Sequence, residues 1–166
     1  MSHELEMIDG VAQMAYAGET PWHGLGTKVS NDMSPVQMMQ KAGLDWTVSK
    51  VPSYVRVGDQ EIETGMEALV RSSDSKVLTQ VGGNWNPVQN EEAFEFFAEY
   101  VNAGDMEMHT AGSLKGGKMI WALAKIKESF DILGGDQVDS YLLFSNPHEY
   151  GKSIDVRFTP IRVVCN

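Results

Sequence analysis

Glycines and lysines cluster in the segment 111–126, the part of the chain whose residue types are best suited to binding phosphate groups. Three glycines there allow backbone angles that are closed to other residues: Gly112, Gly116 and Gly117. Residues 119–126 are mostly bulky and apolar, which is typical of a strand. The pattern predicts a β-hairpin with Lys115 and Lys118 at its tip.

The same segment contains half of a nucleotide-binding motif. Gly112, Gly117 and Lys118 fit the G-x-x-x-x-G-K part of a phosphate-binding loop. The complete motif needs Ser or Thr at the next position to hold magnesium, and a helix whose N-terminus faces the phosphates. Met119 stands there instead, and a strand is expected to follow. The spacing therefore favours a tight turn with solvated lysines over nucleotide hydrolysis.

Positive charge and an aromatic ring recur in the second half of the chain in a pattern typical of a groove for single-stranded nucleic acid. In such a groove, basic side chains contact phosphates and rings stack on bases. The predicted nucleic-acid-binding residues are Lys115, Lys118, Trp121, Lys125, Lys127, Arg157 and Arg162. Lys152 and Trp85 are neighbours of the same kind. Surface lysines also serve solubility alone, and Trp121 also suits a core.

The charge of the chain is unevenly distributed. A formal net charge of -10 argues against a surface that binds nucleic acid everywhere. However, residues 84–111 include six acidic residues and no Lys or Arg, whereas residues 112–127 include four lysines and no acidic residue. The sequence therefore predicts a locally basic hairpin beside an acidic helix.

Residues that could catalyse a reaction or bind a metal do not form a recognisable constellation. The histidines lie in different contexts without zinc-ligand spacing: His3, His23, His109 and His148. His148 and Glu149 are expected to form a solvated turn rather than an acid–base pair, and Cys165 a small core residue. We therefore expect no catalytic residue, no metal and no cofactor. A metal-dependent hydrolase or nuclease that uses Asp136 and Asp139 stays open as a third alternative.

Length and composition predict a single domain over residues 1–166, because 166 residues with 42% hydrophobic content can bury a proper core. The single cysteine excludes an internal disulfide. The sequence has no export signal and no long apolar run, so we expect a cytoplasmic protein without a membrane segment.

The first half of the chain shows clear turn and helix signals. Asp9-Gly10 predicts a type I′ turn in a small hairpin over residues 6–16, within an N-terminal hairpin and loop segment, 1–30. Trp22 is expected to anchor the loop 21–26 to the core. Ser34 and Pro35 are typical of a helix start, and Gly43 of its end. Strands are expected over residues 46–57, with a bulge or edge at Pro52, over 61–71 and over 76–81, as an antiparallel meander.

The second half begins with a helix that Asn90 is expected to cap. Its apolar stripe follows helical spacing and consists of Phe94, Phe97, Ala98 and Val101. Residues 130–138 are expected to be a turn-rich connection, followed by strands over 141–144 and 154–164. The predicted fold class is α+β: a twisted antiparallel sheet of hairpins and a meander, with two main helices packed on one face.

Several blocks resemble one protein family. They are PWHGLG at 21–26, VQNEEAFEFF at 88–97, TAGSLKGGKMIWALAKI at 110–126, and YLLFSNPH and FTPIRVVCN near the end. These blocks are similar to the phage/plasmid-like proteins classed as domain of unknown function 932. The resemblance implies a mobile-element origin and a bacterial host cell. Members are usually longer, so we expect the N-terminal portion of a longer protein.

The order of strands, helix and basic hairpins is also similar to that of phage single-strand annealing recombinases, which form oligomers on DNA without nucleotide hydrolysis. The acidic balance of this chain departs from that pattern. The leading hypothesis is a non-catalytic phage or plasmid protein that binds single-stranded DNA in replication or recombination and can form a homo-oligomer. The alternative is a protein-interaction module, such as an assembly component or an acidic inhibitor of host defence. It would bind a host or phage protein through the helix face at 91–105.

Overall fold

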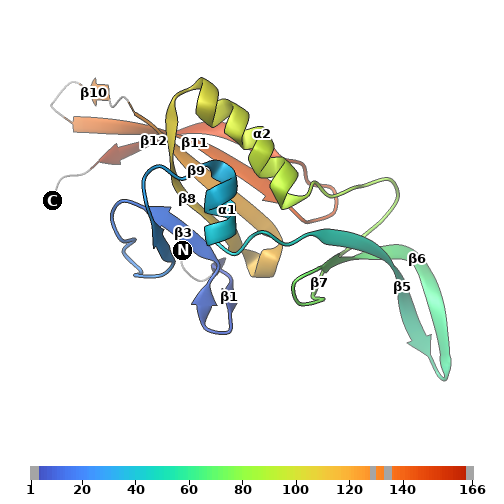
Figure 1. Ribbon diagram of the computed structural model, residues 1–166. Helices are drawn as coiled ribbons and strands as arrows, with labels where there is room; N and C mark the ends of the chain where they lie inside the picture. The colour runs from blue at the N-terminus through green and yellow to red at the C-terminus, as the bar shows by residue number, and fades with distance from the viewer. Residues whose placement is uncertain (1–3, 128–129, 133–135, 164–166) are drawn as a thin grey trace.

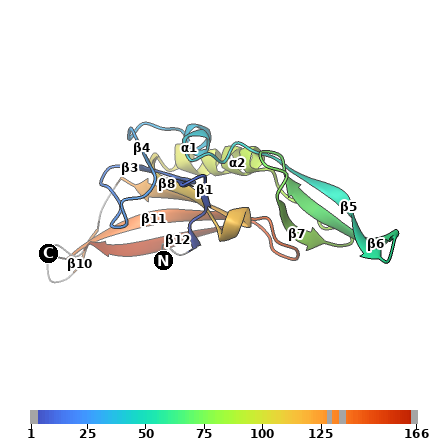
Figure 2. The ribbon, with the colours of Figure 1, turned by 90° about the horizontal axis from the view of Figure 1, so that it is seen from below.

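Two helices cover one face of a seven-stranded sheet in the described part of the chain (Figure 1). The computed structural model describes residues 4–127, 130–132 and 136–163. Figure 2 shows both helices on the same side of the sheet. The predicted α+β class is confirmed.

The main sheet has the order β10-β11-β9-β8-β3-β4, and β12 also pairs with β11. Its strands are β3 (Met14–Ala17), β4 (Thr27–Val29), β8 (Met106–Leu114), β9 (Met119–Ile126), β10 (Phe130–Ile132), β11 (Asp136–Pro147) and β12 (Asp155–Val163). The pairing is antiparallel except between β3 and β4, because the loop 18–26 returns the chain to the start of β3. The predicted connection at 130–138 was wrong, since its described residues pair as β10 and the start of β11.

The N-terminal hairpin consists of β1 (Met7–Ile8) and β2 (Val11–Ala12) and has the predicted turn. Asp9 and Gly10 both have positive φ, 50° and 78°, as a type I′ turn requires. The prediction for Trp22 was wrong: its side chain is 84% exposed. The loop is instead closed by its own polar contacts, including a 2.8 Å hydrogen bond from the Gly24 amide to the Pro21 carbonyl.

Helix α1 (Pro35–Lys41) begins as predicted, with Ser34 as its N-cap. The Ser34 hydroxyl accepts from the Gln37 amide, and the Gln37 side chain accepts from the Ser34 amide, which completes a capping box. Met38 and Met39 are buried against the sheet and α2. This packing fixes the chain that leads into β5.

Helix α2 (Asn90–Ala103) buries the predicted apolar face. Phe94 and Phe97 are fully buried, and Phe97 stacks on Phe144 of β11 with ring centroids 5.2 Å apart. Each such ring contributes about 1.5–3 kcal/mol by burial. Asn90 does not cap the helix as predicted, because its side chain is buried and its Oδ1, the atom that would accept from a helix amide, lies 2.8 Å from Nε2 of His148. Its amide nitrogen donates to the Leu44 carbonyl at 2.9 Å.

Strands β5 (Val48–Val57), β6 (Gln60–Arg71) and β7 (Val77–Val81) form the predicted meander as a separate sheet. The distal part of β5 and β6 projects from the body as a two-stranded ribbon (Figures 1 and 2). We call residues 51–66 the arm. A register shift between Pro52 and Tyr54 marks the predicted bulge at its root. Neither helix of the described residues has the length and apolar character that crossing a membrane requires.

Candidate nucleic-acid interface

The lysine-bearing turn predicted from the sequence connects β8 to β9. Residues 115–117 form one 3-10 turn in which Gly116 and Gly117 have φ values of 66° and 97°. Lys115 is exposed and Lys118 is half-buried. Neither lysine belongs to an ion pair within the described residues. Both ammonium groups are therefore free to bind an anion.

Two further lysines reach this turn from distant parts of the chain. Lys76, which precedes β7, donates its ammonium to the Gly116 carbonyl at 2.9 Å. Lys152 belongs to the loop after β11, which is held to the turn by a 2.8 Å hydrogen bond from the His148 amide to the Lys118 carbonyl. We call the four residues Lys76, Lys115, Lys118 and Lys152 the basic end.

Two acidic residues pair with lysines of the basic end: Glu6 with Lys76 at 3.9 Å, and Glu149 with Lys152. Glu149 pairs with Lys152 at 2.8 Å, and this hydrogen bond lowers the pKa of Glu149. The charges of Lys115 and Lys118 lower that pKa further. The Lys152–Glu149 pair is itself partly exposed, so Lys152 can exchange this partner for another anion.

Aromatic side chains lie beside these lysines. Tyr150 is 54% exposed on the loop of Lys152, and its ring lies next to Gly82. Trp85 is half-buried, and its indole nitrogen donates to the Lys152 carbonyl at 3.1 Å. The basic end thus combines cations with rings on one surface.

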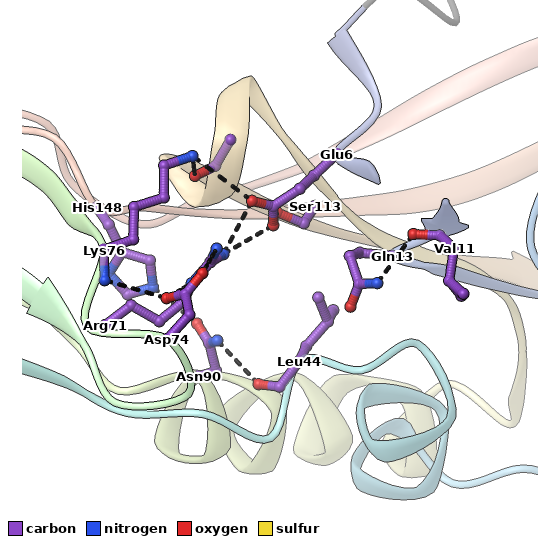
Figure 3. Close-up of polar contacts among 11 residues, drawn as sticks. Glu6, Val11, Gln13, Leu44, Arg71, Asp74, Lys76, Asn90, Ser113 and His148 are labelled. Carbon is purple, nitrogen blue, oxygen red and sulfur yellow. Dashed lines mark hydrogen bonds and ion pairs between the residues drawn. The ribbon is translucent and has the colours of Figure 1, made fainter. Parts of the chain in front are cut away.

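A buried charge network supports the turn from beneath (Figure 3). Arg71 is 1% exposed and donates through Nη1 to both carboxylate oxygens of Glu6, at 2.8 and 2.9 Å. It also makes two hydrogen bonds to Asp74, and these lower the pKa of Asp74 to about 2. Ser113 of β8 donates to Glu6 at 2.9 Å. The network therefore ties the N-terminal segment and the end of β6 to the hairpin.

His148 is a second buried polar group at this site. Its Nε2 lies 2.8 Å from Oδ1 of Asn90, and its ring packs against Trp46. Because the Asn90 amide nitrogen donates to a carbonyl, Oδ1 is the acceptor and Nε2 carries the proton. Burial, aided by the positive charge of Arg71, lowers the pKa of His148 to about 4. The predicted solvated turn was wrong at this residue, which is held as a neutral core side chain.

Comparison with known proteins gives one match. The family model for Domain of unknown function (DUF932) matches residues 77–166, which is more than half of the chain. This chain belongs to the DUF932 family. Searches among curated proteins and among solved structures found no match. The family assignment confirms the resemblance predicted from the sequence, whereas the phage or plasmid origin stays a prediction.

The seven predicted nucleic-acid-binding residues of this DUF932 protein do not gather in one place. Lys115 and Lys118 lie together at the start of β9, whereas Lys125 and Lys127 lie at its other end. Those two distal lysines pair with acidic partners, Asp139 at 3.3 Å and Asp105 at 2.9 Å.

The remaining three predicted residues have other environments. Trp121 is half-buried on β9 opposite Gly112, whose missing side chain leaves room for the indole. Arg157 forms an ion pair with Asp155 on its own strand. The backbone of Arg162 belongs to β12, but its side chain lies outside the described residues.

A polar cleft of about 490 Å³ lies at the other end of the β8–β9 hairpin, where the pairing of the two strands shifts register at His109. Lys125, Asp139 and Tyr141 line it. Burial lowers the pKa of His109. Within the described residues, no group of three His, Cys, Asp or Glu side chains is placed to hold a metal ion.

The sequence reasoning missed Lys76 and Tyr150 as members of the site. Lys76 meets Gly116 across 40 residues of sequence, and no local pattern signals that contact. Tyr150 follows the His148-Glu149 pair, whose proximity to Lys118 depends on one backbone hydrogen bond. The signal for this site in the sequence was the pair Lys152 and Trp85, a basic residue and an aromatic ring that the sequence had placed near the predicted groove.

Proposed function

We propose that this DUF932 protein is a non-catalytic phage or plasmid protein that binds single-stranded DNA in replication or recombination. The observation that supports it is the convergence of four lysines from three segments at the basic end. Phosphate contacts from lysines dominate the affinity for nucleic acid, and exposed rings add base stacking. Lys115 and Lys118 supply charges without a competing ion pair among the described residues.

Reversing two charges at the basic end tests the proposal. The double variant Lys115→Glu, Lys118→Glu should weaken binding of a labelled single-stranded oligonucleotide more than tenfold, measured by fluorescence anisotropy at low salt. Its melting temperature should stay nearly unchanged, because Lys115 is exposed and neither lysine forms an ion pair with any residue that the structure describes. The matched control is Lys28→Glu, Lys41→Glu, which changes two exposed lysines outside the basic end by the same charge. Equal weakening in both variants would contradict a localised site.

Salt dependence provides the number of phosphate contacts. For single strands, the logarithm of the association constant falls linearly with the logarithm of the salt concentration, with a slope of roughly -0.7 per phosphate contact. Four lysines that each contact one phosphate should therefore produce a slope of about -2.8. The double variant should have a clearly shallower slope than the original chain. A slope near zero would show that phosphates are not bound.

Helix α2 supports a second candidate, a protein-interaction module. Its outer face exposes Glu92, Glu95 and Glu99 together with the edge-to-face pair of Phe96 and Tyr100. Such a surface suits a basic partner, since exposed rings and carboxylates both attract Lys and Arg. This candidate predicts a stoichiometric partner from host lysate that resists nuclease treatment and is lost in the variant Glu95→Lys, Glu99→Lys.

A further inference from the structure

A cleft of about 460 Å³ opens next to the basic end. One wall is the segment before α2, with Trp85, Asn86 and Val88, and the other is formed by the end of β11 and the loop 151–154. Its volume is within the range of small-molecule sites, roughly 300–1,000 Å³. The cleft lies where the root of the arm meets the segment before α2, since Lys50 of β5 donates to the Trp85 carbonyl at 2.9 Å.

The lining combines a flat ring with apolar groups. Trp85 is half-buried and is held in place by the hydrogen bond from its indole to the Lys152 carbonyl. Val88, Pro147 and Ile154 add apolar surface. Apolar walls offer a phosphate group no favourable contact. A planar heterocycle, by contrast, stacks on an indole and excludes water from it.

Polar groups at the cleft match the edge of a base. Asn86 is exposed; its amide nitrogen donates to the Asn84 carbonyl at 3.1 Å, and its oxygen accepts from Lys50 at 3.3 Å. An amide has two donor hydrogens and two lone pairs, so Asn86 retains one donor and one acceptor. That pair is complementary to the donor–acceptor edge of a nucleobase.

Lys152 joins the cleft to the basic end. Its carbonyl holds Trp85 inside the cleft, while its ammonium pairs with Glu149 near Lys115 and Lys118. Lys152 therefore contacts the cleft through its carbonyl and belongs to the basic end through its ammonium.

We infer that this cleft binds one unstacked nucleobase of a single strand whose phosphates lie on the basic end. The inference rests on the proposed function and adds a base-recognition site to it. Binding is thus more than electrostatic: a strand with bases binds more tightly than an equally charged strand without them.

The test compares two strands of equal length and charge, an oligothymidylate and its fully abasic analogue, by anisotropy at one salt concentration. The original chain should bind the oligothymidylate at least about fivefold more tightly, the effect of stacking one base. Tryptophan fluorescence should be quenched by the oligothymidylate only. Trp85→Leu and Asn86→Ala should each reduce the preference while leaving affinity for the abasic strand unchanged.

Asn84→Ala is the matched control, because Asn84 is an exposed neighbour that does not line the cleft. Asn86→Ala keeps the test decisive if Trp85→Leu fails to fold, since Asn86 is exposed. Failure to bind either strand would overturn the proposed function itself. Equal affinity for the two strands would overturn only the base site. The base site would also be overturned if Asn86→Ala kept the full preference for the oligothymidylate over the abasic strand.

Discussion

At the scale of single residues, buried charges are the unusual feature of this DUF932 protein. Arg71 is surrounded by Glu6, Asp74 and the ring of Trp46, whose centroid lies 5.1 Å from the guanidinium carbon. Hydrogen bonds to Asp74 and Glu6 hold the pKa of Arg71 above its ordinary value, against the opposing effect of burial. Removing Arg71 would therefore leave the carboxylate of Glu6 buried without its partner.

Arg71→Met should accordingly lower the free energy of unfolding by about 3–5 kcal/mol, because Glu6 would remain buried without its partner. The matched control is Arg56→Met, which breaks the exposed pair with Glu61 on the arm. That change should cost about 0–1 kcal/mol. Urea denaturation monitored by circular dichroism measures both. Similar losses in the two variants would contradict a structural role for the buried network.

His148 gives a pH dependence of stability. Its pKa is about 4 in the folded protein and about 6.5 when unfolded, so the unfolded chain binds more protons between these values. Stability should therefore decrease as pH falls from about 6.5 to about 4, by up to roughly 3 kcal/mol. His109, whose pKa is also lowered, adds to the same trend.

The check is the slope of unfolding free energy against pH in His148→Asn compared with the original chain. The slope should decrease in the variant without vanishing, because His109 remains. Asp74 adds its own loss of stability only as pH falls from its ordinary value of 3.8 toward about 2. A slope unchanged by the substitution would show that His148 is not the group that resists protonation.

At the scale of elements, the β8–β9 hairpin was predictable from the sequence and its surroundings were not. The glycines indicated the turn, and the run of apolar residues indicated strand β9. Ser34 and Pro35 indicated the start of α1. Asn90 failed as a cap because its side chain bonds to distant partners: its Oδ1 accepts from His148, 58 residues away, and its amide nitrogen donates to the Leu44 carbonyl. Local patterns predict which element forms, but a buried carbonyl or an ion pair from elsewhere decides what each polar side chain contacts.

The two glycines of the turn should respond differently to the same substitution. A Cβ at Gly116 would lie 2.5 Å from the ammonium of Lys76, the end of a long, exposed side chain that can adopt another rotamer. A Cβ at Gly117 would lie 2.7 Å from Nη1 of the buried Arg71, which cannot. We expect Gly116→Ala to cost about 1–2 kcal/mol from backbone strain alone, and Gly117→Ala to cost more. Thermal denaturation of both variants checks the order, and the reverse order would contradict it.

At the scale of the whole molecule, the body and the arm differ in how they are stabilised. The body buries its helices against the sheet, with Phe94 and Phe144 among the fully buried side chains. The arm has large apolar side chains in solvent, including Val55, Val57 and Ile62. The sequence predicted the strands of the arm but not their separation from the main sheet, because alternation reports exposure of one face and not which sheet a strand joins.

Hydrogen exchange should reveal this difference directly. A two-stranded ribbon without a packed layer is marginally stable, so amides of residues 54–63 should exchange by local opening far below the global free energy of unfolding. Amides of β9 and β11, which pair on both sides and bury Ile120 and Phe144, should exchange only on global unfolding. Mass spectrometry of labelled peptides measures both.

If single-stranded DNA contacts only the basic end and its cleft, adding it should protect residues 115–118 and 150–152 and leave the arm unprotected. Protection of the arm alone would instead place the ligand there and contradict the site proposed for this protein.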